Sequence, residues 1–342
     1  MSRAYLDWNA TAPLRPEARA AMLAALDLGG NPSSVHAEGR AARALVERSR
    51  EAIAEALGCK PTEVVLTSGA TEAASVLARL PGPVRVPDDA HDALRAHART
   101  GDGPGTLALG LASGETGLLT EPPAARDGLL LLDVTQAVGR IPFAFAWSGA
   151  DMAVLSAHKL GGPKGAGALV LRDGLDAEPL LRGGGQERGR RSGTENVAAV
   201  AGFAAALAAA LRDLAAGAWE PVARMRDRLE ARLAEAHPDT ISVGIDRPRL
   251  PNTLCLVAPG WRGETQVMAM DLLGFAVSAG SACSSGKARV SPALRALGLT
   301  DSDAACALRV SLGTTTTQDE VDRFADAWIA ARTRQRARHR AA

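Results

Sequence analysis

Short apolar runs alternate with helical patterns through the first two-thirds of the chain. Continuous apolar runs bounded by polar or turn residues predict strands that are buried on both faces of a sheet. These runs cover residues 63–67, 129–132, 152–155 and 168–171. Apolar positions at helical spacing predict helices over residues 16–28, 37–57 and 70–80. Buried strands joined by helices indicate an α/β fold, with a mainly parallel central sheet and helices on both faces.

The pattern changes after residue 195. Residues 195–236 form one long helical pattern, and we place a domain boundary inside it near residue 213. Its apolar part, residues 197–211, is mostly alanine and too short to span a bilayer, so it predicts a buried helix. The remaining chain predicts a smaller α+β domain. Its strands are expected at 241–243, 253–257 and 308–311, and its helices at 266–273, 291–297 and 318–333.

Composition excludes several classes of protein. The chain has 342 residues, 46% of them hydrophobic and 23% charged, with a net charge of +1. This balance fits neither a disordered chain nor a strongly basic nucleic-acid binder. Four scattered cysteines without a CxxC pair give no support to a disulfide framework or a metal site. Without a visible secretory signal or membrane span, we expect a cytoplasmic protein. The five arginines within residues 332–340 predict a solvated, fraying helix end in preference to a binding arm.

Polar side chains stand where the predicted strands end, which is where open α/β sheets bind ligands. Asp133 follows four leucines, and Ser156, His158 and Lys159 follow the strand at 152–155. Residues 67–71 form a strand-to-helix turn whose backbone N–H groups suit a phosphate. Together these features indicate pyridoxal phosphate (PLP), with a lysine forming a Schiff base and an acid pairing with the pyridine nitrogen. Taken singly, they also fit a common turn, a capping acid and a surface lysine.

Scarce residue types narrow the choice of reactive groups. The 39 lysine and arginine residues include only four lysines, a bias typical of G+C-rich coding. Lys159 alone directly follows a buried-type strand, so it is our Schiff-base candidate. Cys283 lies among small, flexible residues, which suits an exposed reactive thiol but equally an incidental loop cysteine. Cys255 and Cys306 lie in apolar surroundings and predict core thiols.

Several motifs occur in one order along the chain: Thr67-Ser-Gly-Ala-Thr-Glu72, Asp133-Val-Thr-Gln136, Ser156-Ala-His-Lys159, Arg191-Ser-Gly-Thr194 and Gly280-Ser-Ala-Cys283. In this order they resemble the cysteine desulfurases of the NifS/IscS type, in the class V aminotransferase group. The resemblance spans residues 5–313 and implies the PLP-dependent transferase fold type I. Residues 14–213 would then form the large PLP-binding domain. Residues 1–13 and 214–342 would form the small domain that carries the Cys283 loop.

The resemblance also implies a role for each matching residue. Lys159 would be the Schiff-base lysine and the base that moves the Cα proton, and His91 would stack on the pyridine ring. Asp133 would pair with the pyridine nitrogen, and Gln136 with the phenolic oxygen. The phosphate would be held by Thr71, Ser156, His158 and, from the other subunit of a homodimer, Thr194. Arg309 would bind the substrate α-carboxylate, with Asn252 near the substrate. Cys283 would take the sulfur of L-cysteine as a persulfide for an acceptor protein, leaving L-alanine.

Two departures from the family pattern keep alternatives open. Gly114 stands where the family usually has the second asparagine of an Asn-Asn-Glu motif, and the intervals between His91 and Asp133 are short. The leading hypothesis is a cysteine desulfurase supplying sulfur for iron–sulfur clusters, thio-cofactors or tRNA thiolation. The alternatives are a selenocysteine lyase or another class V lyase or aminotransferase, and a degenerate PLP-binding paralogue with weak activity.

Overall fold

The computed structural model describes residues 3–175, 177–280 and 290–341. The chain divides into two compact units. Unit 1 comprises residues 1–10, 113–119 and 217–342, and unit 2 comprises residues 11–112 and 120–216. Residues 113–119, predicted to belong to the large domain, group with the smaller unit instead. This segment is short, and its polar, glycine-containing sequence does not indicate that the chain passes from one unit to the other there.

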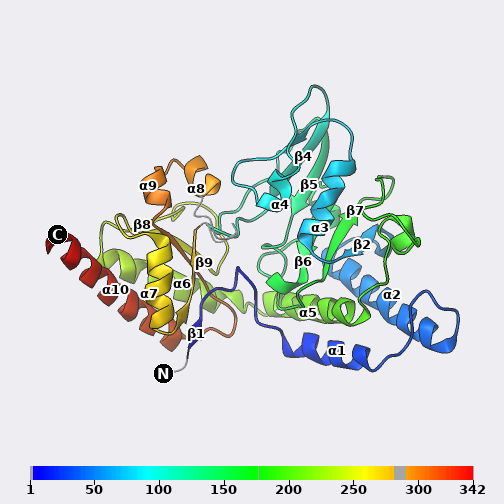
Figure 1. Ribbon diagram of the computed structural model, residues 1–342, viewed down its shortest axis with the longest axis horizontal. Helices are drawn as coiled ribbons and strands as arrows, with labels where there is room; N and C mark the ends of the chain where they lie inside the picture. The colour runs from blue at the N-terminus through cyan, green and yellow to red at the C-terminus, as the bar shows by residue number, and fades with distance from the viewer. Residues whose placement is uncertain (1–2, 176, 281–289, 342) are drawn as a thin grey trace. The chain divides into compact units, whose positions relative to one another are not determined.

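Unit 2 contains a six-stranded sheet in the order β2-β7-β6-β5-β4-β3 (Figure 1). Only β7 runs antiparallel to its neighbours, which confirms the mainly parallel α/β fold. Two strands, β3 and β4, were not predicted, β4 because its apolar run, residues 107–109, is only three residues long. The strands are β2 (Val64–Thr67), β3 (Val84–Arg85), β4 (Gly105–Gly110), β5 (Gly128–Asp133), β6 (Met152–Ser156) and β7 (Gly167–Leu171).

Helices cover both faces of this sheet. Helices α1 (Pro16–Leu26), α2 (Ala37–Leu57) and α5 (Val197–Ala215) cover one face, and α3 (Ala70–Ala74) and α4 (Asp92–Arg95) the other. Side chains of a strand alternate between faces, so Leu130 and Leu132 pack under the first group while Leu131 packs under the second. The helix predicted at 70–80 is a short α-helix continued by a 3₁₀ turn, Ser75–Arg79.

The long helical pattern after residue 195 is two helices. Helix α5 ends before Gly217, which has a φ of +71°, and α6 (Trp219–Ala236) follows. The two units divide at this glycine rather than inside a helix. By length and composition α5 could cross a membrane, yet 56% of its apolar window is buried inside the protein. It packs against α1 and α2, as expected of a core helix.

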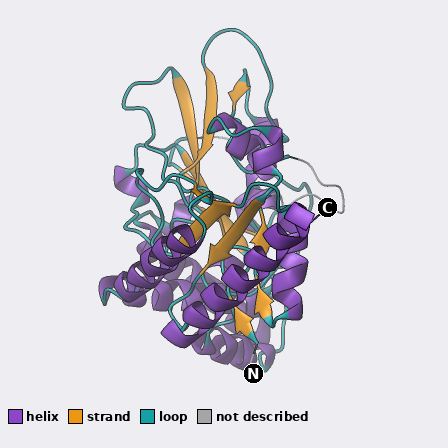
Figure 2. Cartoon of the chain, turned by 90° about the vertical axis from the view of Figure 1, so that its left-hand side faces the viewer, coloured by secondary structure: helices purple, strands orange, loops and turns teal. Residues whose placement is uncertain are grey.

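Unit 1 is the smaller α+β part. Its four-stranded antiparallel sheet has the order β11-β12-β9-β8, and a two-stranded sheet pairs β1 with β10. Helix α10 packs beside α6 and α7 (Figure 2). The strands are β1 (Ala4–Tyr5), β8 (Ile241–Ser242), β9 (Thr253–Val257), β10 (Phe275–Ala276), β11 (Ser278–Ala279) and β12 (Ala307–Ser311). The remaining helices are α7 (Gly263–Leu272), α8 (Pro292–Ala296), α9 (Asp301–Ala304) and α10 (Gln318–Ala341).

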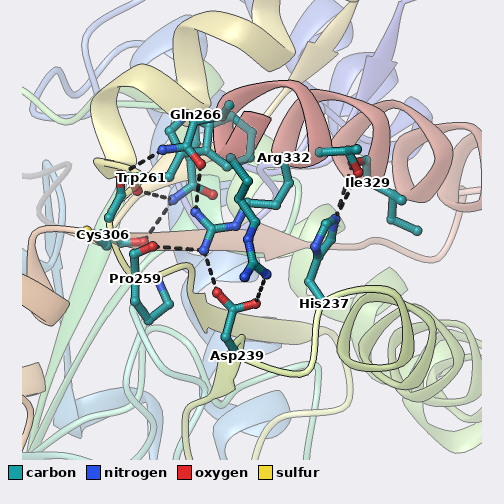
Figure 3. Close-up of polar contacts among 12 residues, drawn as sticks. His237, Asp239, Pro259, Trp261, Gln266, Cys306, Ile329 and Arg332 are labelled. Carbon is teal, nitrogen blue, oxygen red and sulfur yellow. Dashed lines mark hydrogen bonds and ion pairs between the residues drawn. The ribbon is translucent and has the colours of Figure 1, made fainter. Parts of the chain in front are cut away.

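The arginine-rich end of α10 is not wholly solvated, so that expectation is wrong for Arg332. Its side chain is buried, and Nη2 donates to Asp239 and to the carbonyl of Pro259, both at 2.8 Å (Figure 3). Nearby, Gln266 accepts a hydrogen bond from the Trp328 indole and donates to backbone carbonyls. A spacing of arginines along a helix cannot reveal an acid that lies 93 positions away.

Candidate active site

The predicted strand-end residues of unit 2 share one edge of its sheet. Strands β2, β5 and β6 run parallel, so their carboxyl ends point the same way. In the register, Gly167 of β7 pairs with Thr67 on one side and with Ser156 on the other. Asp133 pairs with Val154 on the next strand. The prediction that these strand ends lie together at the ligand-binding edge of the sheet is therefore confirmed.

The turn after β2 passes very close to β7. Gly69 has a φ of +157°, and a Cβ on Gly167 would lie 2.5 Å from its Cα. A Cβ on Gly69 would in turn lie 3.4 Å from the hydroxyl of Ser156. Only glycines allow this approach, which lays the backbone before Thr71 against the end of β6. Thr71 itself is exposed and Ser156 is buried.

A buried arginine links Gln136 to the lysine turn. Arg140 donates from Nη1 to the side-chain oxygen of Gln136, and from Nη2 to the backbone carbonyl of Lys159 at 3.0 Å. Asp133 is half-buried, and its Oδ1 accepts from the N–H of Thr135 at 2.9 Å. The hydroxyl of Thr135 is buried and has no hydrogen-bond partner among the described residues. Arg140 was not predicted as a site residue, because in the sequence an arginine after a turn looks like a surface residue.

The two predicted site histidines sit in different surroundings. Burial, with the charges of Lys159 and Lys164, lowers the pKa of His158 to about 4, so its imidazole is neutral near pH 7. Its Nδ1 lies 3.2 Å from the hydroxyl of Thr11. His91 is exposed and caps α4, where Nδ1 accepts from the N–H of Ala93 at 3.1 Å. Its stacking on a pyridine ring stays a prediction.

Thr194 lies exposed in a glycine-rich loop that a buried ion pair anchors. Glu187 accepts from Arg50 at 2.6 and 2.7 Å, and from the N–H of Leu66 on edge strand β2 at 2.8 Å. Glu187 and Arg188 have φ values of 50° and 57°, which residues other than glycine rarely adopt. The ion pair thus holds a strained backbone beside the strand that leads to Thr71. Exposure leaves Thr194 accessible, and its role toward a second subunit stays a prediction.

Arg309 lies in unit 1, on β12. Its side chain is buried, with Nη2 2.7 Å from Asp7 and Nη1 3.0 Å from the carbonyl of Gly114. Its Nε is also buried and has no hydrogen-bond partner among the described residues. Asp7 and Gly114 therefore fix the guanidinium, whose Nε keeps a donor for a further acceptor, as a carboxylate-binding arginine requires.

Gly114, which stands in place of the family asparagine, contacts Arg309 and Asn9 through its backbone carbonyl. Asn9 donates from Nδ2 to the Gly114 carbonyl at 3.1 Å and to Thr253 at 2.9 Å. Asn252 is fully buried, and its amide donates to Asn9 and to the carbonyl of Leu312. Both of its N–H bonds are used internally, so Asn252 here supports the arginine site through Asn9. Direct contact of Asn252 with substrate stays a prediction.

The three described thiols differ in burial, while Cys283 lies outside the described residues. Cys255 and Cys306 are buried, as predicted for core thiols. Burial raises the pKa of Cys59 to about 12 and also raises that of Cys255. A thiol with a raised pKa stays protonated at neutral pH and is a poor nucleophile.

Comparison with known proteins identifies the relatives of this chain. Residues 4–89 and 108–324 match the family described as Aminotransferase class-V. The chain belongs to this family. It is 36% identical to a cysteine desulfurase from Cereibacter sphaeroides, over 95% of this chain and 94% of that one. It is 37% identical to a cysteine desulfurase from Frankia sp. (strain EuIK1), over 94% and 89% of the two chains.

Solved structures agree in fold. A NifS-like protein from Rickettsia africae ESF-5 superposes with a TM-score of 0.87 at 27% identity, covering 96% of this chain and 99% of that one. A second NifS-like protein superposes with a TM-score of 0.85 at 28% identity and the same coverage. These matches confirm the resemblance drawn from the short motifs and the expected fold.

The residues of unit 2 fit the PLP on which this family depends. A close glycine turn next to the Ser156 hydroxyl offers backbone and side-chain donors for a phosphate. At the neighbouring strand end, the half-buried Asp133 can pair with a pyridine N–H, and the unpaired hydroxyl of Thr135 leaves a polar group to be satisfied. Lys159 ends the 3₁₀ turn Ala157–Lys159, which directly follows β6, and so places a lysine at this edge of the sheet.

Proposed function

We propose that this chain is a cysteine desulfurase that uses PLP to convert L-cysteine into L-alanine and passes the sulfur to an acceptor protein. The observation that carries this proposal is the gathering of Asp133, Gln136, Ser156 and Lys159 at one sheet edge in a chain of this family. Relatives named cysteine desulfurase align with more than nine-tenths of the chain. No feature of the described residues favours one of the alternative activities.

Each cofactor-site residue has a distinct task. Ser156, Thr71 and the N–H groups of the Gly69 turn would hold the phosphate, together with His158. Asp133 would keep a proton on the pyridine nitrogen, because a carboxylate beside that proton favours the charged form. Bound PLP would then withdraw electrons from the substrate Cα. Lys159 would accept the Cα proton and later return one to the carbon that becomes the methyl group of alanine.

Substrate recognition falls to Arg309. Its guanidinium would bind the α-carboxylate of L-cysteine through donors that Asp7 and Gly114 leave available. A guanidinium can make two parallel hydrogen bonds to a carboxylate, which fixes orientation as well as affinity. This grip would fix the orientation of the bound substrate.

The sulfur step is assigned to Cys283. Its thiolate would attack the substrate sulfur, forming a sulfur–sulfur bond while the carbon–sulfur bond breaks and its electron pair stays with the carbon fragment. The products are a persulfide on Cys283 and, after protonation, alanine. The raised pKa values of Cys59 and Cys255 and the burial of Cys306 support this assignment. The persulfide would then pass to an acceptor protein.

A homodimer is part of the proposal. The exposed position of Thr194 in a loop held by a buried ion pair suits a hydroxyl that reaches the phosphate site of a second copy. Sedimentation analysis of the PLP-loaded protein should then give twice the chain mass. A monomer that retains full activity would contradict this assignment of Thr194.

Release of sulfide and alanine from L-cysteine, in the presence of a reductant, tests the activity. Wild-type protein should release both in equal amounts. Lys159→Ala should lose the visible absorption of the bound cofactor together with turnover, whereas Cys283→Ala should keep the absorption and lose sulfide release. Cys59→Ala serves as the matched thiol control and should behave as wild type. Sulfide release by Cys283→Ala at the wild-type rate would contradict the persulfide step.

A further inference from the structure

Arg140 is a buried cation that no known role of the site explains. It lies four residues after Gln136, in the turn that follows β5, and only 4% of it is exposed. Its Nη1 donates to the side-chain oxygen of Gln136 and, at 3.4 Å, to the backbone carbonyl of the same residue. Its Nη2 donates to the carbonyl of Lys159 at 3.0 Å. One guanidinium thus touches the two residues assigned to the phenolic oxygen and to the Schiff base.

The chemistry of these groups fixes how the Gln136 amide is turned. A guanidinium carries only donors, so the amide atom that faces Arg140 must be the oxygen. The amide nitrogen, which only donates, then faces the opposite way. A phenolate oxygen can only accept, so this orientation offers it the correct partner. A reversed amide would place two donors against each other at Arg140 and an acceptor at the phenolate.

We propose that Arg140 is a positioning residue, which presents the Nε2 of Gln136 to the phenolic oxygen of the cofactor and fixes the backbone of Lys159. The inference rests on the proposed function for the presence of PLP, but not on the identity of its substrate. Arg140 touches neither substrate nor reacting atoms. It acts through two residues that do, from a position that the sequence does not distinguish from a surface arginine.

The proposal predicts the sign of a spectroscopic change. A hydrogen bond donated to the phenolate reduces its hold on the proton of the adjacent imine nitrogen, and a nearby positive charge further disfavours that cationic group. Replacing Arg140 by methionine removes both effects. The midpoint of the pH-dependent visible absorption of the cofactor, measured without substrate, should then rise by about one pH unit or more.

Three variants separate positioning from a merely structural role. Gln136→Glu keeps an acceptor for Arg140 but offers no donor to the phenolate, so it should raise the midpoint as Arg140→Met does. Arg140→Lys retains a charge and should restore part of the wild-type midpoint, which keeps the test valid if the methionine variant folds poorly. Arg172→Met is the matched control. Arg172 also donates to a backbone carbonyl in unit 2, that of Ala150, and bonds neither Gln136 nor Lys159.

Absorption midpoint, PLP dissociation constant and melting temperature are measured for each variant. A raised midpoint with weaker PLP binding in Arg140→Met and Gln136→Glu, and an unchanged midpoint in Arg172→Met, would support the proposal. A lowered melting temperature with an unchanged midpoint and PLP affinity in Arg140→Met would overturn it. Failure of the proposed function gives a different result: wild-type protein that shows the PLP absorption but no sulfide release contradicts the desulfurase, not this inference.

Discussion

The carboxylate of Asp7 holds the guanidinium of Arg309 at 2.7 Å across a separation of 302 positions in the chain. The other oxygen of Asp7 accepts from the hydroxyl of Ser278 at 2.8 Å, so the carboxylate itself is fixed. Both partners are largely buried, with 15% of the Asp7 side chain and 7% of the Arg309 side chain exposed. Asp7 therefore determines the direction in which the remaining donors of Arg309 point.

Removal of Asp7 should weaken substrate binding more than turnover. In Asp7→Ala the guanidinium of Arg309 loses a charge-assisted hydrogen bond. The guanidinium is then less ordered in the free protein, and binding of the substrate carboxylate must order it. We expect KM for L-cysteine to rise about tenfold with kcat changed little, since charge-assisted bonds contribute about 1.5–3 kcal/mol. Steady-state alanine formation measures both constants. Asp271→Ala, which removes the exposed partner of Arg3, is the control. A lowered KM would mean instead that Asp7 competes with the substrate for Arg309.

Loss of Glu187 from its buried pair with Arg50 should destabilise unit 2. Only 1% of the Glu187 side chain and 6% of the Arg50 side chain are exposed. Glu187→Ala leaves the buried guanidinium of Arg50 with only its longer carboxylate contacts, at 3.3 Å, to the partly exposed Glu47, and it frees the N–H of Leu66. The free energy of unfolding should therefore fall by about 3–5 kcal/mol. Urea unfolding of the protein without PLP measures this loss.

An exposed ion pair provides the comparison for Glu187. Lys60 and Asp173 lie 2.6 Å apart, but 67% and 50% of their side chains are exposed. Water screens such a pair, so Asp173→Asn should leave the unfolding midpoint almost unchanged. If Glu187→Ala and Asp173→Asn lowered the free energy of unfolding equally, burial of the ion pair would not explain the contribution of Glu187 to stability.

The sequence predicts the site residues that follow strands, but not those that are held by tertiary contacts. Asp133, Ser156 and Lys159 were found because each follows a continuous apolar strand, and the ends of parallel strands necessarily share an edge. Arg140, Asp7 and Glu187 were not found. Their partners are fixed by tertiary contacts, and a charged residue has the same appearance in the sequence whether it is solvated or buried in an ion pair. Cys283 rests on the sequence alone, because it lies outside the described residues.

The titration of His158 should reveal its buried position. Its pKa in the folded protein is lowered to about 4, while an unfolded chain has the ordinary value near 6.5. Acidification therefore protonates the unfolded chain first, and the contribution of His158 to stability is complete above pH 6.5 and lost as the pH falls toward 4. The ring-proton NMR signal of His158, assigned by its absence in His158→Gln, should show a midpoint near 4 without PLP.

Binding of PLP should move the same midpoint in the opposite direction. A phosphate beside the imidazole favours its charged form, so the NMR midpoint of His158 should rise when PLP is added. This change would support the assignment of His158 to the phosphate. A titration midpoint near 6.5 without PLP would show that the imidazole of His158 is solvated. A midpoint that does not change when PLP is added would show that the phosphate does not bind beside His158.

Gly167 should be essential for the phosphate turn although it carries no side chain. In Gly167→Ala the new Cβ would lie 2.5 Å from the Cα of Gly69 and 2.6 Å from the carbonyl oxygen of Leu155. The turn before Thr71 must then move away from β7, and PLP affinity should fall about tenfold, a loss within the range expected for about 1–3 kcal/mol of overpacking. Fluorescence titration of the protein with PLP measures this constant. Gly29→Ala is the control, because nothing lies within 4 Å of a Cβ there. Unchanged affinity in Gly167→Ala would mean that the phosphate does not depend on the close approach of the Gly69 turn to β7.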